Sequence, residues 1–225
     1  MASPTLQPNG FHAPLDERSF YDAVGELSRR DQDLAGVVEK YGAPPLWLRE
    51  PGFPTLVYII LEQQVSLASA KAAFDRLQAA VRPLTPGRFL KLSRAELKRI
   101  GFSRQKAHYT QLLAEAITKR RLDLRALDDL HDDAARQRLL ALKGIGPWTA
   151  DIYLLSALRR PDIWPVGDLA LATAVQSVKK LRRRPSPEKL GAMSTPWRPW
   201  RAVAARLFWH HYLSERSQPS AQVSL

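Results

Sequence analysis

The sequence predicts an all-α fold for this chain of 225 residues. Apolar side chains recur at helical spacing in several long runs, and no alternation typical of a β-strand persists for more than a few residues. No internal repeat is visible. With 45% hydrophobic residues, the chain can bury a substantial core, either as one domain or as two closely packed helical lobes.

The first elements are predicted from apolar spacing and from the residues that interrupt it. Residues 1–16 are rich in proline and have no period, so we interpret them as a flexible lead-in. Residues 17–215 are interpreted as the folded domain and residues 216–225 as a disordered tail. Within the domain, two amphipathic helices lie on either side of Asp31, and the turn residues at 42–45 end the second.

An apolar helix near residues 55–61 is predicted to lie at the centre of the core, because it is hydrophobic nearly all round. The sequence turns polar at Gln63 and Gln64, and a new helical pattern begins at Ser66. The two glutamines are therefore expected at a corner between helices. By residue type alone, glutamines at such a corner are more often surface or capping residues than functional ones.

The later helices are predicted from their caps. Ser93 and Glu96 have the spacing of a capping box, Gly101 ends that segment, and Ser103 caps the long helix that follows. Three further helices are predicted, over residues 132–142, over residues 169–178, and from residues 197–201 onward.

Net charge, cysteine content and the length of apolar runs limit the classes of function that the chain can have. The formal net charge of +12, from 34 Lys and Arg against 22 Asp and Glu, favours a polyanion such as nucleic acid, although a basic solvated surface is common and charge alone is weak support. The absence of cysteine excludes disulfides, thiolate zinc sites and cysteine-ligated iron–sulfur clusters. The longest apolar run is too short to cross a bilayer and no signal peptide is apparent, so we expect a soluble, cytoplasmic protein without a membrane partner.

Residues 139–150, LLALKGIGPWTA, predict two helices joined by a tight loop. Gly144 and Gly146 cannot continue the first helix, since each favours a positive φ or a close backbone approach. Pro147 suits the first position of the second helix. The loop amides and the start of that helix form an electropositive concavity that can seat a phosphate. Taken alone, the glycines could equally well do no more than close a helical hairpin.

Asp168 follows a break in the helical pattern and directly precedes the apolar run that begins at Leu169. An Asp in this position is an ideal N-cap, which is its commoner role. A carboxylate just beyond a phosphate-binding hairpin can also stabilise positive charge that develops nearby and orient a water molecule. The two roles are compatible, because a helix N-terminus favours the anionic form of the side chain.

Four motifs occur in a particular order: IILEQQVS at residues 59–66, GFSRQKA at 101–107, LKGIGPWTA at 142–150 and PVGDLAL at 165–171. In these motifs the chain resembles the helix-hairpin-helix DNA glycosylases, and within them the 3-methyladenine DNA glycosylase II family of the AlkA type. The resemblance covers most of residues 53–215. It implies two closely packed helical lobes with the helix-hairpin-helix motif and an active-site cleft between them.

The resemblance implies a monofunctional DNA glycosylase of base-excision repair. Such an enzyme flips an alkylated base, such as 3-methyladenine or 7-methylguanine, out of double-stranded DNA and hydrolyses its N-glycosidic bond. Asp168 is assigned as the catalytic carboxylate, which stabilises an oxocarbenium-like transition state. The protein is expected to act as a monomer in association with the nucleoid.

Aromatic walls are expected to bind the extruded base, because an electron-rich indole attracts a cationic alkylated purine. Trp148 and Trp209 are the first candidates, although most of the six tryptophans of a helical protein serve as core. By resemblance, Trp209 matches a base-stacking tryptophan, and Ile152 and Leu169 stand where some relatives have tyrosines, which indicates a wider, more aliphatic pocket. Further aromatic candidates are Trp197, Trp200 and Tyr153.

Contacts with DNA are expected from the hairpin and from the glutamine corner. The hairpin residues expected to bind the DNA backbone are Gly144, Ile145, Gly146, Pro147 and Thr149. By resemblance, the corner is the family's wedge loop, whose side chain enters the gap left by the extruded nucleotide. Gln64 occupies the wedge position, where some relatives have a large apolar residue.

The resemblance also bears on cofactors. In relatives, a monovalent cation such as Na⁺ or K⁺ is held by hairpin carbonyls and bridges to a DNA phosphate; here these carbonyls are those of Leu140, Leu142 and Ile145. No other cofactor is expected. Relatives that also cut the strand carry a Schiff-base lysine where this chain has Trp148, so water is the expected nucleophile and no lyase activity is expected.

Two alternatives remain open. The chain could be a non-enzymatic module that uses the hairpin only to grip DNA, although such a module has no reason to keep Asp168 and the WPVGD segment around it. It could also be a glycosylase for other modified bases, such as mismatched adenine or oxidised pyrimidines. The absence of cysteine argues against the branches of those families that carry an iron–sulfur cluster.

Overall fold

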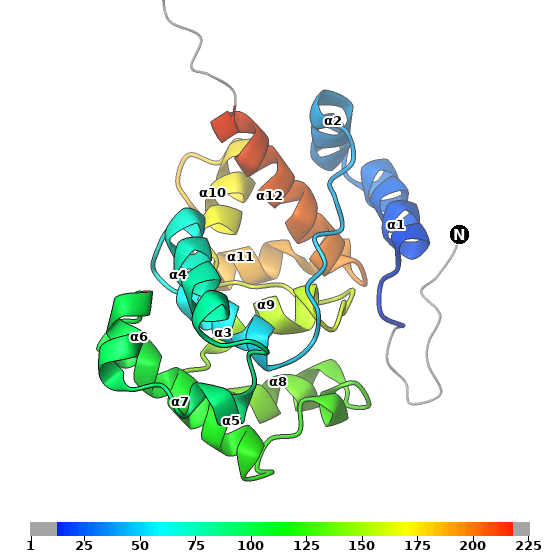
Figure 1. The fold of residues 1–225 in the computed structure, drawn as a ribbon. Coiled ribbons are helices and arrows are strands. Elements are labelled where there is room, and N and C mark those ends of the chain that lie inside the picture. Colours follow the sequence, from blue (N-terminus) through cyan, green and yellow to red (C-terminus); the bar gives the residue numbers. More distant parts are fainter. Residues whose placement is uncertain (1–12, 218–225) are drawn as a thin grey trace, which may run out of the picture. The chain divides into compact units, whose positions relative to one another are not determined.

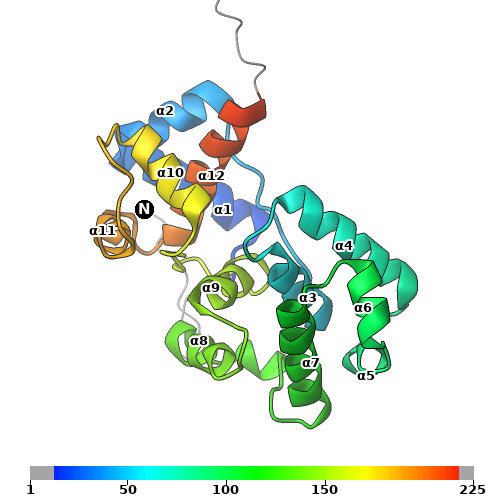
Figure 2. The same ribbon diagram turned by 90° about the vertical axis from the view of Figure 1, so that its left-hand side faces the viewer.

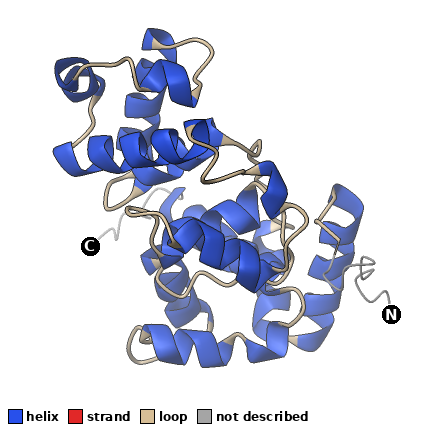
Figure 3. Ribbon diagram, turned by 90° about the horizontal axis from the view of Figure 1, so that it is seen from below, coloured by secondary structure: helices blue, strands red, loops and turns tan. Residues whose placement is uncertain are grey.

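The computed structural model describes residues 13–217, and every regular element within them is a helix (Figures 1 and 3). The predicted all-α fold is confirmed for this part of the chain. The chain divides into two compact units. The first is built from Met1–Trp47 and Arg159–Leu225, of which residues 13–47 and 159–217 are described, and the second from Leu48–Leu158.

The boundaries of the folded part differ from the predicted ones. Most of the predicted lead-in and tail, residues 1–12 and 218–225, lie outside the described residues. Leu15, however, is buried, and its N–H donates to the carbonyl of Arg159 at 2.8 Å. Ser217 is still helical. Packing therefore begins before residue 17, and the last helix extends two residues beyond residue 215.

The first unit is built from two stretches of sequence, one that precedes the second unit in the chain and one that follows it. The helices of these two stretches pack together (Figure 2). Its elements are α1 (Glu17–Arg30), α2 (Gln32–Tyr41), α10 (Leu169–Val178), α11 (Pro187–Met193), a 3₁₀ turn (Thr195–Trp197) and α12 (Arg201–Ser217). Helix α12 lies against α10, α2 and α1. Phe20, Val24 and Leu27, one face of α1, are buried. Since α12 packs against three of the helices, the core of this unit forms around it.

The last helix begins at the end of the segment predicted to open it. Residues 197–201 were predicted to open this helix, and α12 begins at Arg201. Arg198 is extended, with φ −61° and ψ 142°, because a residue that precedes a proline is disfavoured in the helical region. Pro199 thus separates the 3₁₀ turn from α12.

In the second unit, α3 is central. Its elements are α3 (Phe53–Glu62), α4 (Leu67–Ala80), α5 (Pro86–Phe89), α6 (Arg94–Ile100), α7 (Arg104–Thr118), a 3₁₀ turn (Arg125–Leu127), α8 (Asp132–Leu140) and α9 (Pro147–Ser156). Helix α3 packs against α4, α7 and α9, as its apolar character predicts. The capping box at Ser93 and the left-handed Gly101 at the end of α6 are also as predicted. Among the described helices, none is long and apolar enough to span a membrane.

Asp31 holds several elements of the first unit together. Its carboxylate caps α2 and accepts hydrogen bonds from Lys179 Nζ at 2.7 Å and from Trp197 Nε1 at 2.8 Å. Burial alone would raise the pKa of Asp31, but the hydrogen bonds from Lys179 and Trp197 outweigh it and hold the pKa below its ordinary value. The ionised form of Asp31 therefore stabilises the fold.

We expect Asp31→Asn to lower the free energy of unfolding by about 1–3 kcal/mol at neutral pH, because the ammonium of Lys179 then keeps only the more exposed carboxylate of Asp33, 2.8 Å away, as its ion-pair partner. The asparagine can still cap α2. Because the folded-state pKa is depressed, the stabilisation is present above the unfolded pKa of about 4 and is lost as the pH falls through the folded pKa. Urea unfolding of both proteins should show the difference shrinking with acidification. The exposed Asp22→Asn is the control, and a difference that is constant with pH would contradict the ion-pair interpretation.

Candidate active site and nucleic-acid interface

Helices α8 and α9 form the predicted hairpin, and Gly144 in its loop has a left-handed backbone with φ +97°. A Cβ on Gly144 would overlap Cβ and Cγ of Tyr109, a residue of α7. No side chain fits this space, so glycine is required both by the backbone conformation and by the close approach of the ring. The prediction made for this glycine is confirmed.

Gly146 differs from Gly144. It is the N-cap of α9 with an extended backbone, φ −87° and ψ 176°, and a Cβ there would meet no heavy atom within 4 Å. The expectation of a positive φ or a close approach within the protein is therefore wrong for Gly146. The space beside it, at the N-terminus of α9, is open to a ligand that approaches the backbone closely.

A buried ion pair joins the two helices of the hairpin. Arg136 on α8 donates from Nε to Oδ1 of Asp151 on α9 at 2.6 Å, and from a terminal nitrogen to Oδ2 at 3.2 Å. Asp151 is buried. A bidentate pair fixes both distance and orientation, so the loop between the helices is held in one geometry.

The five predicted DNA-binding residues of the hairpin fall into two groups. Gly146 and Pro147 are exposed and Gly144 is half-buried. Ile145 and Thr149 are buried, and the hydroxyl of Thr149 accepts a hydrogen bond from inside the protein. Ile145 and Thr149 could therefore contact DNA only through their backbone groups.

The three carbonyls expected to hold a cation lie at the C-terminal end of α8 and in the loop that follows it. Leu140 is the last residue of α8, and the carbonyl of Leu142 accepts the N–H of Ile145 at 3.1 Å. A carbonyl oxygen has a second lone pair, and a helix C-terminus carries negative partial charge. These groups are chemically suited to a hard monovalent cation. No cluster of three or more His, Asp or Glu side chains offers a metal site within residues 13–217.

Asp168 is the N-cap of α10, as predicted, and its side chain also contacts a predicted pocket residue. Oδ1 accepts the N–H of Leu171 at 2.7 Å and the indole N–H of Trp209 at 3.1 Å. The two donors come from α10 and α12. They fix the carboxylate and orient the indole beside it, so the first unit brings these two predicted site residues together.

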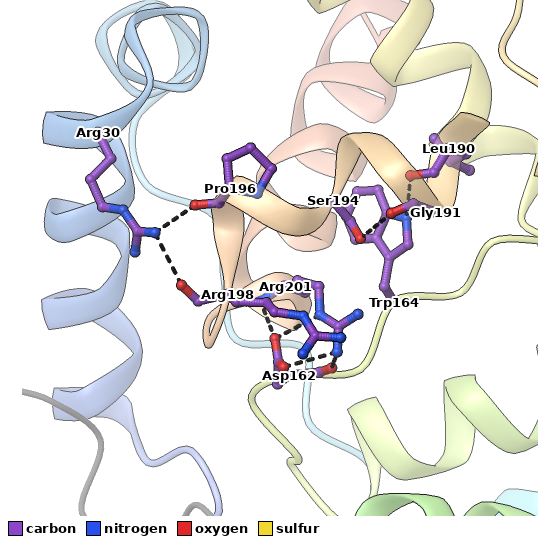
Figure 4. A network of polar contacts seen from close by, with 9 residues as sticks. All are labelled: Arg30, Asp162, Trp164, Leu190, Gly191, Ser194, Pro196, Arg198 and Arg201. Atoms are coloured by element: carbon purple, nitrogen blue, oxygen red, sulfur yellow. Dashed lines mark hydrogen bonds and ion pairs between the residues drawn. The ribbon is translucent and has the colours of Figure 1, made fainter. Parts of the chain in front are cut away.

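The segment that leads to Asp168 is anchored at two points (Figure 4). Asp162 forms a bidentate pair with Arg201, with distances of 2.7 and 2.8 Å. The indole N–H of Trp164 donates to the carbonyl of Leu190 at 3.0 Å. Both contacts hold the chain just before the turn that ends at the catalytic candidate.

The four predicted base-pocket residues lie on three helices. Trp209 on α12 is half-buried, and Leu169 at the start of α10 is 68% exposed. Trp148 and Ile152 lie on α9, in the second unit, half-buried and buried respectively. A leucine side chain is rarely this exposed, and Leu169 directly follows the fixed carboxylate of Asp168 in the chain. The pocket role of Trp148 and Ile152 stays a prediction.

The further aromatic candidates belong to the core. Trp197, Trp200 and Tyr153 are all buried. The indole N–H groups of Trp197 and Trp200 donate to Asp31 and Glu26, and burial raises the pKa of Tyr153 to about 12. The hydroxyl of Tyr153 accepts the N–H of Gly52 at 2.9 Å. All three side chains therefore have a hydrogen-bond partner inside the protein, and the role observed for them is structural.

The glutamine corner has features that the sequence reasoning missed. Gln64 is exposed and has a left-handed backbone with φ +57°. Its neighbours Val65 and Leu67 are also exposed, at 46% and 62%. Apolar side chains next to a wedge position suit contact with stacked bases. Two apolar residues directly after two glutamines are visible in the sequence, and this pattern could have indicated a surface that contacts bases.

Comparison with known proteins agrees with this geometry. Residues 57–199 match the model of the HhH-GPD superfamily of base excision DNA repair proteins. YfjP of Bacillus subtilis, provisionally named a DNA-3-methyladenine glycosylase, is 27% identical over 184 residues, 78% of this chain and 64% of YfjP. The DNA-3-methyladenine glycosylase of the same organism is 27% identical over 122 residues, 54% of this chain and 40% of the relative. The chain thus spans less than two thirds of the length of either relative.

A solved structure shares the fold. The 3-methyladenine DNA glycosylase of Schizosaccharomyces pombe, in complex with abasic DNA, superimposes with a TM-score of 0.79 over 84% of this chain and 95% of that one, at 24% identity.

Proposed function

Because the chain belongs to the HhH-GPD superfamily of base excision DNA repair proteins, we propose that it is a monofunctional DNA glycosylase that removes alkylated bases from double-stranded DNA. It hydrolyses the N-glycosidic bond, leaves the strand intact, and acts as a monomer on the chromosome. The names of its relatives as DNA-3-methyladenine glycosylases support this substrate class.

One observation carries the proposal: the carboxylate of Asp168 is fixed by the N–H of Leu171 and the indole N–H of Trp209. As the glycosidic bond stretches, positive charge grows at C1′ and on the ring oxygen of the sugar. A carboxylate that is already oriented stabilises this charge without reorganisation and can direct a water molecule to C1′. Two donors on one oxygen, from α10 and α12, also hold the side chain in place.

The base itself is bound by stacking. An N-alkylated purine is cationic, so it leaves readily and is attracted to the face of an indole by about 1–2 kcal/mol when water is excluded. Trp209 is the proposed stacking residue, and the exposed Leu169 is proposed to contact the base as well.

The hairpin is proposed to bind the DNA backbone at Gly146 and Pro147, where the open space at the start of α9 and the helix dipole suit a phosphate. A Na⁺ or K⁺ ion held by the carbonyls of Leu140, Leu142 and Ile145 would add a positive charge facing the same phosphate. No organic cofactor is needed for hydrolysis.

A base-release assay tests the proposed function. Duplex oligonucleotides with one 3-methyladenine, 7-methylguanine, ethenoadenine or hypoxanthine are incubated with the protein, and the free base is measured by chromatography. We expect release of at least one cationic alkylated purine. No release from any duplex, with an active glycosylase as the positive control, would reject the proposal.

We expect no strand cleavage and no covalent intermediate, because Trp148 stands where a Schiff-base lysine would be needed and an indole cannot form an imine. The measurement is borohydride trapping with a lesion-containing duplex, analysed by denaturing electrophoresis. Efficient trapping that disappears when a lysine is mutated, for example Lys143→Met, would contradict the monofunctional assignment.

A further inference from the structure

The corner that carries Gln64 is bonded to the hairpin through the preceding residue. Gln63 Nε2 lies 3.1 Å from the carbonyl oxygen of Gly144 and 2.9 Å from Oγ1 of Thr149. A carbonyl can only accept a hydrogen bond, so the amide of Gln63 must present its nitrogen to the hairpin. Both its position and its orientation are thereby set.

Both acceptors, the carbonyl of Gly144 and the hydroxyl of Thr149, are held in place by their surroundings. Gly144 is held in its left-handed conformation against the ring of Tyr109. Thr149 is 1% exposed and lies in the first turn of α9, the turn that follows the open space at Gly146. The two hydrogen bonds therefore tie the glutamine corner to the part of the hairpin that is proposed to bind a phosphate.

The other side of the corner, the last turn of α3, is also fixed. Lys106 Nζ donates to the carbonyl of Leu61 at 2.7 Å, where a positive charge suits a helix C-terminus. Arg49 forms a bidentate pair with Glu62 at 2.7 and 2.9 Å. Gln63 is the one residue between this fixed turn and Gln64. Backbone bonds from the N–H of Gln63 and of Val65 shape the corner at 3.3 and 3.5 Å, and the side chain of Gln63 adds the link between Gln64 and the hairpin.

We infer that Gln63 is a positioning residue that couples the grip of the hairpin on the DNA backbone to the insertion of Gln64 into the duplex. This inference rests on the proposed function. A phosphate bound at the hairpin fixes the first turn of α9 and the carbonyl of Gly144, and Gln63 transmits that placement to the neighbouring residue. The coupling matters only in a duplex, where an extruded nucleotide leaves a gap to be filled.

The first test is Gln63→Met, which keeps the length of the side chain and removes both donors. We expect single-turnover release from a 7-methylguanine duplex, or from whichever duplex the wild type prefers, to fall about tenfold. Release from the same strand alone and binding of undamaged duplex should change by less than about twofold. Gln78→Met, on the exposed face of α4, is the matched control. Equal losses on duplex and single strand would overturn the inference.

A double-mutant cycle with Gln64→Ala separates positioning from general support of the fold. If Gln63 acts through Gln64, Gln63→Met has no further effect on duplex release once Gln64 has been truncated, whereas independent losses that add would overturn the inference. Thr149→Val removes one acceptor with little change in shape and is expected to impair duplex release selectively. It keeps the inference testable if Gln63→Met does not fold.

A fluorescence readout needs no base release. A duplex with a tetrahydrofuran abasic-site analogue next to 2-aminopurine reports filling of the gap when the wild type binds. At equal fractions bound, we expect a smaller fluorescence change with Gln63→Met, and equal changes would overturn the coupling even if the wild type is an active glycosylase. If the wild type releases no base but still gives a larger fluorescence change than Gln63→Met, the proposed function is rejected and the coupling through Gln63 is retained.

Discussion

Asp168→Asn is expected to reduce base release by a factor of about 10²–10³ or more while DNA binding is retained. The substitution removes the negative charge that would stabilise the oxocarbenium-like state, and loss of one preorganised electrostatic group has effects of this size. DNA binding is retained because it depends on contacts between the hairpin and the DNA backbone, which do not involve Asp168. Single-turnover rates and filter binding with a lesion-containing duplex measure the two effects separately.

The fold should tolerate this substitution well. Asparagine is as good an N-cap as aspartate, and its oxygen can accept the same N–H groups of Leu171 and Trp209 that Asp168 accepts. Asp22→Asn, on the exposed face of α1, makes the same change in net charge and serves as control. Release near the wild-type rate would remove Asp168 from the mechanism. Binding without release in the wild type itself would favour the alternative of a non-enzymatic DNA-binding module.

Gly144→Ala is expected to destabilise the second unit by about 3 kcal/mol or more. The methyl group would have to occupy a left-handed backbone position and would also overlap the ring of Tyr109, and each of the two effects costs on the order of 1–3 kcal/mol. Such a loss is a large part of the stability of a typical domain. Urea unfolding followed by far-UV circular dichroism measures it.

Gly146→Ala is the matched control two residues away. Its backbone is extended and a methyl group would meet nothing within 4 Å, so unfolding should change by less than about 0.5 kcal/mol. DNA binding should nevertheless weaken, because the methyl group enters the space proposed for a phosphate. Equal destabilisation by the two substitutions would mean that the hairpin loop is not packed as described.

The elements that are determined locally could be predicted from the sequence. Asp168, Ser93 and Ser103 cap helices because a side-chain oxygen reaches an N–H two or three residues ahead. The all-α fold and the central apolar helix also follow from spacing within short stretches. These features depend on neighbours in the chain, which the sequence displays directly.

Contacts between distant segments could not be predicted in this way. Nothing near Gly144 in the sequence indicates that Tyr109 fills the space beside it, and nothing near Gln63 indicates its bonds to the hairpin more than 80 residues later. Contacts with distant segments also explain why Trp197, Trp200 and Tyr153, which were predicted as pocket candidates, belong to the core. Trp197 packs in the core because its ring contacts Trp164 and Phe208 and its N–H donates to Asp31, and Asp31 is far away in the chain.

The second unit is one continuous stretch, residues 48–158, whereas the first is assembled from segments that precede and follow it. Near the points where the chain enters and leaves the second unit, the N–H of Arg49 donates to the carbonyl of Ser156 at 3.0 Å. During translation the ribosome therefore completes the hairpin before it has made α10 or α12, and domains fold as units as they emerge. A nascent chain can thus hold a folded hairpin while Asp168 and Trp209 have yet to be synthesised. The machinery that would break a glycosidic bond is the last to be assembled.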